Sequence, residues 1–289
     1  MTVTYDEGLV RDLLRDQHPD LAGLPLREVD GGWDNQLWRL GDDLAVRLPR
    51  TDRAPDLIRQ EQRWLPGLAP LPLPVPVPVR TGEPSALLDR PWTIARWIDG
   101  EPADREPVTN PASAETLARF LRALHQPAPE DAPANPSRGI SLEALDAQTT
   151  GMFDLIPGHP ATEALRQVWQ DALAASPWDG PGLWLHGDLH PANVVTRAGA
   201  LCGVLDFGDM CAGDPATDLS AAWLLLPEPA RFFEAYACDP ASITRARGWA
   251  VARAIGLVMI GRNGRLGVPG GKPTWEPAGQ AALERLAAS

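Results

Sequence analysis

Three polar residues, Asp188, Asn193 and Asp206, stand in an order that suits the transfer of a phosphoryl group. Asn193 follows Asp188 by five positions, and Asp206 follows Asn193 by thirteen, as the first residue of an Asp-Phe-Gly triplet. In such a set the first carboxylate accepts the proton of an attacking hydroxyl, while the amide and the second carboxylate hold Mg²⁺ against phosphates. Turn formation explains each residue alone, but it does not explain the ordered set. The spacing therefore predicts a catalytic Asp188 and metal ligands at Asn193 and Asp206.

The residues around this set predict short strands that would hold it. Residues 183–185 (Leu-Trp-Leu) are typical of a buried strand that leads into the loop of Asp188. Residues 194–196 and 201–205 predict a hairpin around residues 197–200. Both metal candidates would then lie at hairpin ends, where a rigid scaffold can hold oxygen ligands together.

Composition limits the classes of protein that fit. The chain has 289 residues with 44% hydrophobic content, enough for one large or two modest domains. It has no apolar run of about 18 residues, so we expect no membrane span, and its first residues do not read as a secretory signal. Three cysteines without metal-ligand spacing (Cys202, Cys211 and Cys238) favour reduced thiols in a cytoplasmic protein.

The charge balance is strongly acidic, with a formal net charge of −12 and a pI of about 4.8. Nucleic acid is therefore not expected as a partner, because its binding needs basic patches. An acidic surface can attract a cationic small molecule, or it can serve solubility alone. Apart from Lys272 the basic residues are all arginines, a bias typical of GC-rich bacterial genomes.

The N-terminal part predicts a strand-rich lobe. A helix is expected at 6–14, strands at 24–29, 36–40, 44–48 and 92–98, and a second helix at 55–65. Residues 70–78 alternate proline with Leu and Val, which forbids a helix and favours an extended connector. Asp99-Gly100 would mark the crossing into a second lobe. That lobe should be mainly helical, with helices at 112–125, 141–150, 162–175, 215–226, 229–237, 242–263 and 276–288.

One strand and one helix of the first lobe predict an ion pair. In residues 44–48, Ala45 and Arg47 face one way and the three apolar residues face the other. In the helix at 55–65, Glu61 falls on the apolar face with Ile58 and Leu65. A carboxylate turned toward a core needs a cationic partner. Arg47 is the natural candidate. An exposed arginine on the strand and an exposed glutamate at the edge of the helix would, however, give the same sequence pattern.

The segment HGDLHPAN…LDFGD (residues 186–193 and 205–209) resembles the catalytic and metal-binding segment of the aminoglycoside phosphotransferase family, small-molecule relatives of protein kinases. The resemblance implies an α+β, two-lobed protein-kinase-like fold, with an antiparallel-sheet N-lobe (1–98) and a mainly helical C-lobe (99–289). It also implies Mg²⁺ and ATP or GTP as phosphate donor.

The resemblance further implies roles for individual residues. Asp188 would be the catalytic base, and His190 would contact the transferred phosphate or simply pack. Nucleotide contacts would come from a phosphate-covering loop, from the strand–helix ion pair and from the junction of the lobes (Gly31, Gly32 and Asn35; Ala45, Arg47 and Glu61; Arg96, Trp97 and Ile98). Arg47 stands where the family carries a lysine, and a guanidinium can bind phosphate bidentately.

The acceptor is expected to be a small molecule, since only five residues separate Gly208 from Asp214 and leave no room for a peptide platform. The implied function is a kinase for a hydroxyl of an antibiotic, an aminoglycoside or another secondary metabolite, in resistance or self-protection. A kinase for a sugar, an amino-sugar or a choline-like metabolite is the close alternative. A catalytically inactive protein that binds nucleotide or drug is the alternative of another class, favoured only by the Arg47 departure.

Overall fold

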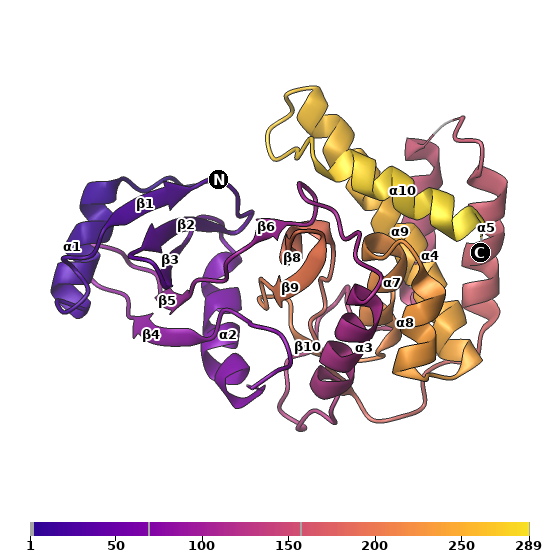
Figure 1. Ribbon diagram of the computed structural model, residues 1–289, viewed down its shortest axis with the longest axis horizontal. Helices are drawn as coiled ribbons and strands as arrows, with labels where there is room; N and C mark the ends of the chain where they lie inside the picture. The colour runs from indigo at the N-terminus through magenta and orange to yellow at the C-terminus, as the bar shows by residue number, and fades with distance from the viewer. Residues whose placement is uncertain (1–2, 69, 157, 289) are drawn as a thin grey trace. The chain divides into compact units, whose positions relative to one another are not determined.

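Alternating apolar residues build a five-stranded antiparallel sheet in the computed structural model, which describes residues 3–68, 70–156 and 158–288. Its strands are β1 (Leu26–Val29), β2 (Asn35–Leu40), β3 (Leu44–Pro49), β4 (Pro78–Gly82) and β5 (Trp92–Arg96). They lie in the order β1-β2-β3-β5-β4, so β3 is central (Figure 1). Arg47 pairs with Leu37 on β2 and with Thr93 on β5, which fixes its register from both sides.

Two helices cover opposite faces of this sheet. Helix α1 (Glu7–Gln17) packs on the face of Val46 and Leu48 and completes an apolar core there. Helix α2 (Ala54–Leu68) packs against β3, β4 and β5 on the other face, toward which Arg47 points. Side chains alternate along a strand. The apolar residues of β3 therefore lie on the face that α1 covers, and Ala45 and Arg47 lie on the face that α2 covers.

The sheet differs from the sequence prediction at β4 and β5, and β1 begins at Leu26, two residues after the predicted start. Strand β4 was not predicted, because Pro78 begins it and proline is usually excluded from strands; as a first residue at the edge of the sheet it needs no ladder donor. Strand β5 ends at Arg96, two residues before the predicted end. The proline-rich residues 70–77 form neither helix nor strand, as expected.

The chain divides into two compact units. The first comprises residues 1–70, 74–99 and 205–208, and the second comprises 71–73, 100–204 and 209–289. The short Leu205–Gly208 segment, which carries Asp206, therefore groups with the sheet of the first unit. A single boundary along the chain cannot describe this division.

Two small sheets lie in the second unit. One contains β6 (Glu101–Pro102), β8 (Val194–Arg197) and β9 (Ala200–Val204). The hairpin of β8 and β9 was predicted, and Ala198 and Gly199 turn it with positive φ angles of 50° and 72°. The other sheet pairs β7 (Leu183–Leu185) with β10 (Cys211–Gly213). Asp188 follows β7, and Asn193 immediately precedes β8.

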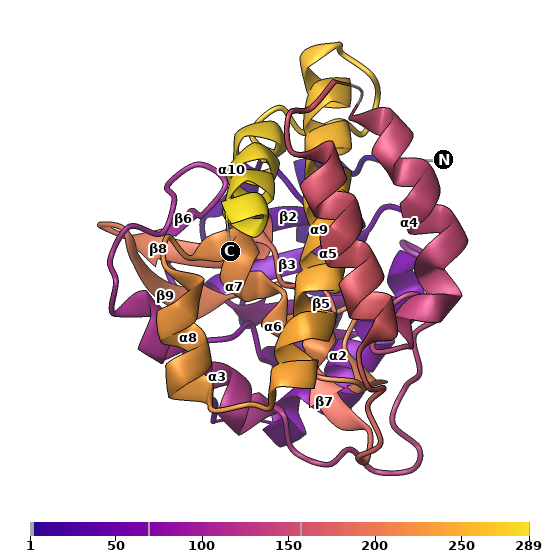
Figure 2. The same ribbon diagram turned by 90° about the vertical axis from the view of Figure 1, so that its right-hand side faces the viewer.

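The longest elements of the second unit are helices. Its helices are α3 (Ser113–Leu124), α4 (Asp146–Met152), α5 (Thr162–Ala174), α6 (Ala216–Leu219), α7 (Ala221–Leu225), α8 (Pro229–Tyr236), α9 (Pro240–Arg265) and α10 (Trp275–Ala288), with short 3-10 turns η1 (Leu142–Leu145), η2 (Phe153–Leu155) and η3 (Pro191–Asn193). Helix α9 is the longest, and α4, α5, α6 and α10 pack against it (Figure 2). It carries Arg245 and Arg253 into the interior of the unit.

Two predicted helices are interrupted. The segment expected as one helix to residue 226 forms α6 and α7 with Ser220 between them, and the Ser220 hydroxyl donates to the carbonyl of Thr217 at 2.6 Å. The segment expected at 141–150 begins as η1 before it becomes α4. Among the residues that the structure describes, no helix is long and apolar enough to cross a membrane.

Candidate active site

Asp218 shapes the loop that follows β7. Its carboxylate accepts the backbone N–H groups of His186 at 2.7 Å and Gly187 at 2.9 Å, and it lies 3.3 Å from His125 Nε2. Gly187 has φ +83°, and a Cβ there would lie 2.3 Å from the carbonyl oxygen of Asp209. The loop therefore needs both a buried acid and a glycine to reach its shape, and it presents the next residue, Asp188.

Asp188 is held by four side chains. Its Oδ1 accepts from Arg138 Nη2 at 2.9 Å and from Arg253 Nη1 at 3.0 Å. Its Oδ2 lies 3.4 Å from both His190 Nε2 and Asn193 Nδ2. Burial alone would raise the pKa of Asp188, but His190 and the two guanidinium groups outweigh burial and hold this pKa well below its usual value. Asp188 is therefore an anion at neutral pH, with Oδ2 the less tightly bound oxygen.

His190 has a defined tautomer. Its Nδ1 accepts the backbone N–H of Ala192 at 3.2 Å, so the proton resides on Nε2, which faces Asp188. The ring is 7% exposed and lies against the Trp275 ring of α10, with centroids 4.6 Å apart. His190 thus packs, as one of the two predicted alternatives had it, and it also contacts the Asp188 carboxylate, which was not predicted.

Asn193 is oriented by the same loop. Its Nδ2 donates to the backbone carbonyl of Asp188 at 3.0 Å. Because the amide nitrogen faces Asp188, the amide oxygen faces away from it and remains an acceptor. This is the orientation that a metal ligand needs.

In the first unit, Arg47 and Glu61 form the predicted ion pair, with Arg47 Nη1 donating to Glu61 Oε2. Their side chains are 10% and 1% exposed. Arg47 Nη2 also reaches Asp206 Oδ1 at 3.4 Å. Burial raises the pKa of Glu61 to about 7, an effect that Arg47 opposes and Asp206 reinforces. One guanidinium therefore serves two carboxylates, one buried and one largely accessible.

Asp206 adopts an unusual backbone conformation, with φ +57°. Aspartate tolerates this left-handed region better than most residues, and such conformations cluster at functional sites. Its side chain is 42% exposed, and Oδ1 also accepts from the Gly208 N–H at 3.4 Å. Among the described residues, its other oxygen has no hydrogen-bond donor.

The loop before β2 is tied to the start of α2. The buried Asp34 accepts from Thr51 Oγ1 at 2.6 Å and from Arg53 Nη2 at 2.8 Å. Gly32 has φ +66°, and a Cβ there would lie 2.1 Å from the carbonyl oxygen of Asn35. Asn35 is not a loop residue but the first residue of β2, paired with Pro49. The loop is thus a tight glycine turn held by Asp34.

Arg96, Trp97 and Ile98 were predicted to offer backbone groups to a purine. Their backbone N–H and C=O groups do not all point to the same side of the strand. The Trp97 N–H donates to the carbonyl of Asp43 at 2.8 Å, on the side of β3. Antiparallel strands direct successive residues to opposite sides, so Arg96 and Ile98 direct theirs away from β3; the Arg96 N–H donates to Val77 O at 3.3 Å. The N–H groups of Trp97 and Arg96 are therefore both already used within the first unit.

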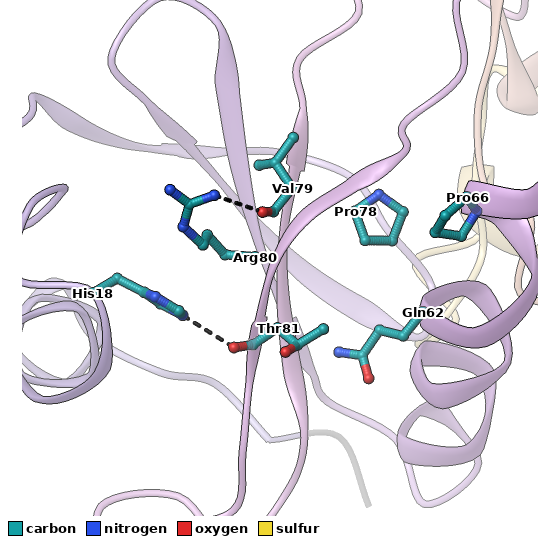
Figure 3. A pocket seen from close by; sticks show the side chains of 7 residues that line it. All are labelled: His18, Gln62, Pro66, Pro78, Val79, Arg80 and Thr81. Carbon is teal, nitrogen blue, oxygen red and sulfur yellow. Dashed lines mark hydrogen bonds between the residues drawn. The ribbon is translucent and has the colours of Figure 1, made fainter. Parts of the chain in front are cut away.

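A shallow pocket of about 340 Å³ lies elsewhere in the first unit (Figure 3). Its lining comes from α1, α2 and β4 and the residues beside them (His18, Gln62, Pro66, Pro78, Val79, Arg80 and Thr81). The His18 Nε2 lies 3.1 Å from the Thr81 carbonyl oxygen, so polar groups around this pocket bond within the unit. None of the predicted site residues lines it.

The predicted Mg²⁺ ligands suit that ion chemically. Asn193 and Asp206 both offer oxygen, which a hard cation prefers, and each has an oxygen directed away from its own hydrogen bonds. The described residues contain no cluster of three or more His, Cys, Asp or Glu side chains that could hold a metal by themselves. Mg²⁺ in phosphoryl-transfer enzymes commonly uses one or two protein ligands together with phosphates and water, so two donors are sufficient.

Sequence reasoning missed the partners of these residues. Arg138 comes from the loop before η1 and Arg253 from α9, far from Asp188 in the chain. No local sequence pattern identifies these two arginines. They lie 50 and 65 positions from Asp188, much farther than the repeat of a helix or a strand can relate. The contact of Arg53 with Asp34 was missed in the same way, although Asp34 itself stands in the polar loop that the sequence predicts.

The family model of the phosphotransferase enzyme family (APH) matches residues 25–255 of this sequence. The chain belongs to this phosphotransferase family. The predicted fold class is confirmed, since solved phosphotransferase structures share the antiparallel N-terminal sheet and the helical C-terminal part. No curated protein sequence matches the chain.

Three solved structures illustrate the likeness. The GDP complex of aminoglycoside 2'-phosphotransferase-IIIa is 18% identical with a TM-score of 0.66, over 98% of this chain and 99% of that one. Macrolide 2'-phosphotransferase MphH from Brachybacterium faecium is 22% identical with a TM-score of 0.58, over 96% and 97%. A mutant of aminoglycoside phosphotransferase APH(4)-Ia with AMP-PNP and hygromycin B is 16% identical with a TM-score of 0.60, over 96% and 98%. At these identities the likeness establishes the fold alone.

Proposed function

We propose that this protein transfers the γ-phosphate of a Mg²⁺-bound ATP or GTP to a hydroxyl of a small molecule, an antibiotic or a related secondary metabolite. The observation that carries the proposal is the state of Asp188, an ionised carboxylate fixed by four side chains, with an oriented Asn193 beside it. The family match supports the reaction class. The nucleotides and antibiotics bound to structural neighbours support the nature of donor and acceptor.

In this proposal Asp188 orients the acceptor hydroxyl and takes its proton at Oδ2, the oxygen with the longer contacts. The strongly lowered pKa makes Asp188 a weak base. It therefore acts mainly by holding the hydroxyl in line and accepts the proton late, which suits a loose phosphoryl-transfer transition state. His190 fixes the orientation of the carboxylate.

Asn193 and Asp206 would hold Mg²⁺, which supplies charge neutralisation for the phosphates when it is bound. Arg47 would hold the nucleotide phosphates with its guanidinium, in the role of the usual lysine, and Glu61 would keep Arg47 on that face of the sheet. Gly31 and Gly32 would bring backbone N–H groups close to phosphate. The backbone groups of Arg96, Trp97 and Ile98 that are not used within the first unit would bind the base, and Ala45 would lie beneath it.

The test is a transfer assay in which MgATP and MgGTP are each combined with kanamycin, hygromycin B, a macrolide, glucosamine and choline. Products are identified by mass spectrometry. Phosphorylation of one antibiotic in preference to the sugar and choline supports resistance or self-protection, and the reverse preference supports a metabolite kinase. Absence of Mg²⁺-dependent binding of either nucleotide would contradict the proposal. Nucleotide binding without any Asp188-dependent turnover would favour the inactive binding protein.

A further inference from the structure

Two guanidinium groups converge on one oxygen of Asp188. Arg138 and Arg253 both donate to Oδ1, at 2.9 and 3.0 Å. Arg253 also donates to the backbone carbonyl of Gly187, and its side chain is only 10% exposed. Positioning a carboxylate takes one arginine, so the second guanidinium needs another explanation.

The second positive charge is costly where it lies. Burial lowers the pKa of Arg253, and the neighbouring Arg138 lowers it further. The nearest other carboxylates are engaged, since Asp218 is fully buried and accepts two backbone N–H groups, and Asp209 accepts from Asn135 at 3.1 Å. Two like charges near one carboxylate favour a further anion at the same spot.

The hydrogen-bond inventory points the same way. The Nε atoms of Arg138 and Arg253 are both buried, and neither has a hydrogen-bond acceptor. Buried donors without acceptors are rare and are costly to maintain. Both Nη atoms of each arginine already donate, those of Arg138 to Ser137 and Asp188. An oxyanion would therefore be bound once the more exposed Arg138 turns toward it, because guanidinium matches carboxylate and phosphate bidentately.

Glu276, which lies near the loop of Asp188 and His190, is already paired with arginines. Glu276 follows Trp275, whose ring lies against His190, yet it accepts from Arg262 at 3.3 Å and from Arg265 at 2.5 Å. A polycationic acceptor would need free carboxylates beside Asp188, and Glu276 does not provide one.

Resting on the proposed function, we propose that Arg138 and Arg253 form an oxyanion-binding site beside the Asp188 carboxylate. The bound group is either a carboxylate or similar anion on the acceptor, next to the hydroxyl to be phosphorylated, or the phosphoryl group in transfer. In the first case the acceptor is a hydroxy acid rather than a polycation. Arg253 is the fixed member, anchored on Gly187, and the 27%-exposed Arg138 is the member that turns toward the anion.

The test is calorimetric titration of the full-length protein with inorganic phosphate, D-glycerate, the neutral glycerol and kanamycin. Wild type should bind phosphate and glycerate in preference to glycerol and kanamycin. Arg138→Met should weaken anion binding roughly tenfold to a hundredfold, the value of a charge-assisted hydrogen bond, and Arg138→Lys should weaken it less. Arg119→Met, on the exposed face of α3, is the matched control and should bind as wild type does. Thermal unfolding of each variant verifies that it is folded.

Saturation with MgAMP-PNP separates the two sources of the anion. Continued anion binding alongside the nucleotide assigns the site to the acceptor, and displacement assigns it to the transferred phosphoryl. Equal anion affinity in wild type and a folded Arg138→Met, or no anion binding by wild type, would overturn the oxyanion site. Because this titration needs no turnover, its failure is distinguishable from failure of the transfer assay.

Discussion

At the scale of single residues, Arg47 carries a role that a lysine could not fill in the same way. Its guanidinium spans Glu61 and Asp206, which lie 14 and 159 positions away in the chain. An ammonium is a point charge and lacks the planar fork that makes two directed contacts. The arginine therefore pairs with Glu61 and reaches Asp206 at the same time.

The first prediction concerns the Arg47–Glu61 pair. A double-mutant cycle with Arg47→Met and Glu61→Gln should show a coupling energy well above about 0.5 kcal/mol, the limit for independent sites. The physical reason is that Arg47→Met leaves the buried Glu61 without its cationic partner, and Glu61→Gln leaves Arg47 only its longer contact to Asp206. Denaturant unfolding of the four proteins measures it. Simple additivity, together with a normal nucleotide KM for Arg47→Met, would return Arg47 to the role of an ordinary strand residue.

The second prediction concerns pH. The pKa of Glu61 is about 7 in the folded protein, against 4.5 for the free side chain. The unfolded chain releases this proton first as the pH rises, so folding loses stability between those two values. Relative to Glu61→Gln, the free energy of unfolding of wild type should fall by up to about 3 kcal/mol across that range. Urea titrations at several pH values test this, and a difference that does not change with pH would refute it.

Side-chain contacts were easiest to predict from the sequence where the repeat of a strand or a helix shows which face a residue lies on. Alternation along residues 44–48 and the apolar face of 55–65, together with the resemblance to the strand–helix ion pair of kinases, predicted the Arg47–Glu61 pair. The contacts of Asp188 could not be predicted, because Arg138 and Arg253 meet it only through the tertiary fold. A motif identifies a reactive group, but the groups that set its charge come from elsewhere in the chain.

At the scale of elements, the turn before β2 requires a glycine at position 32. Gly32→Ala would force a Cβ to 2.1 Å from the Asn35 carbonyl at φ +66°. We expect a loss of about 1–3 kcal/mol in stability and a raised nucleotide KM, because the turn must open. Gly23→Ala is the control, since a Cβ there meets nothing within 4 Å. Nucleotide KM and thermal unfolding are measured for both, and unchanged values for Gly32→Ala would remove the loop from the nucleotide site.

Most elements were predictable, and the exceptions have physical causes. Hairpins with polar turns and amphipathic helices were found from period alone, as β2–β3 and α3 illustrate. Strand β4 was missed because its first residue is a proline, and the α6–α7 break because tertiary packing and Ser220 interrupt a continuous apolar segment. Sequence periodicity is therefore a poor guide at the edge of a sheet and at a residue whose side chain hydrogen-bonds to the backbone of its own helix.

At the scale of the whole molecule, the chain passes between its two units more than once, so residues that are close in sequence belong to different units. Asp206 belongs to the first unit, through the inserted Leu205–Gly208 segment, and Asn193 belongs to the second.

The prediction at this scale is a Mg²⁺-dependent thermal shift. A ligand at a hundred times its Kd stabilises by about 2.7 kcal/mol, so MgATP or MgGTP should raise the Tm of wild type by several degrees. Asp206→Ala should abolish the Mg²⁺-dependent part, and Asn193→Ala should require more Mg²⁺ for the same shift. Glu130→Gln, an exposed acid, should behave as wild type. Equal metal dependence in all four proteins would be incompatible with this site.

The most direct test of the central claim is the turnover of Asp188→Asn, measured as phosphate transfer with whichever acceptor the panel identifies, or as nucleotide hydrolysis in its absence. The variant should bind the Mg²⁺–nucleotide complex as wild type does, because Asn193 and Asp206 are unchanged. Its kcat should fall by about 10²–10⁴-fold. The variant also leaves Arg138 and Arg253 without their carboxylate, so its Tm should fall, and turnover is compared below the unfolding transition. A folded Asp188→Asn with kcat within a few-fold of wild type would contradict the account.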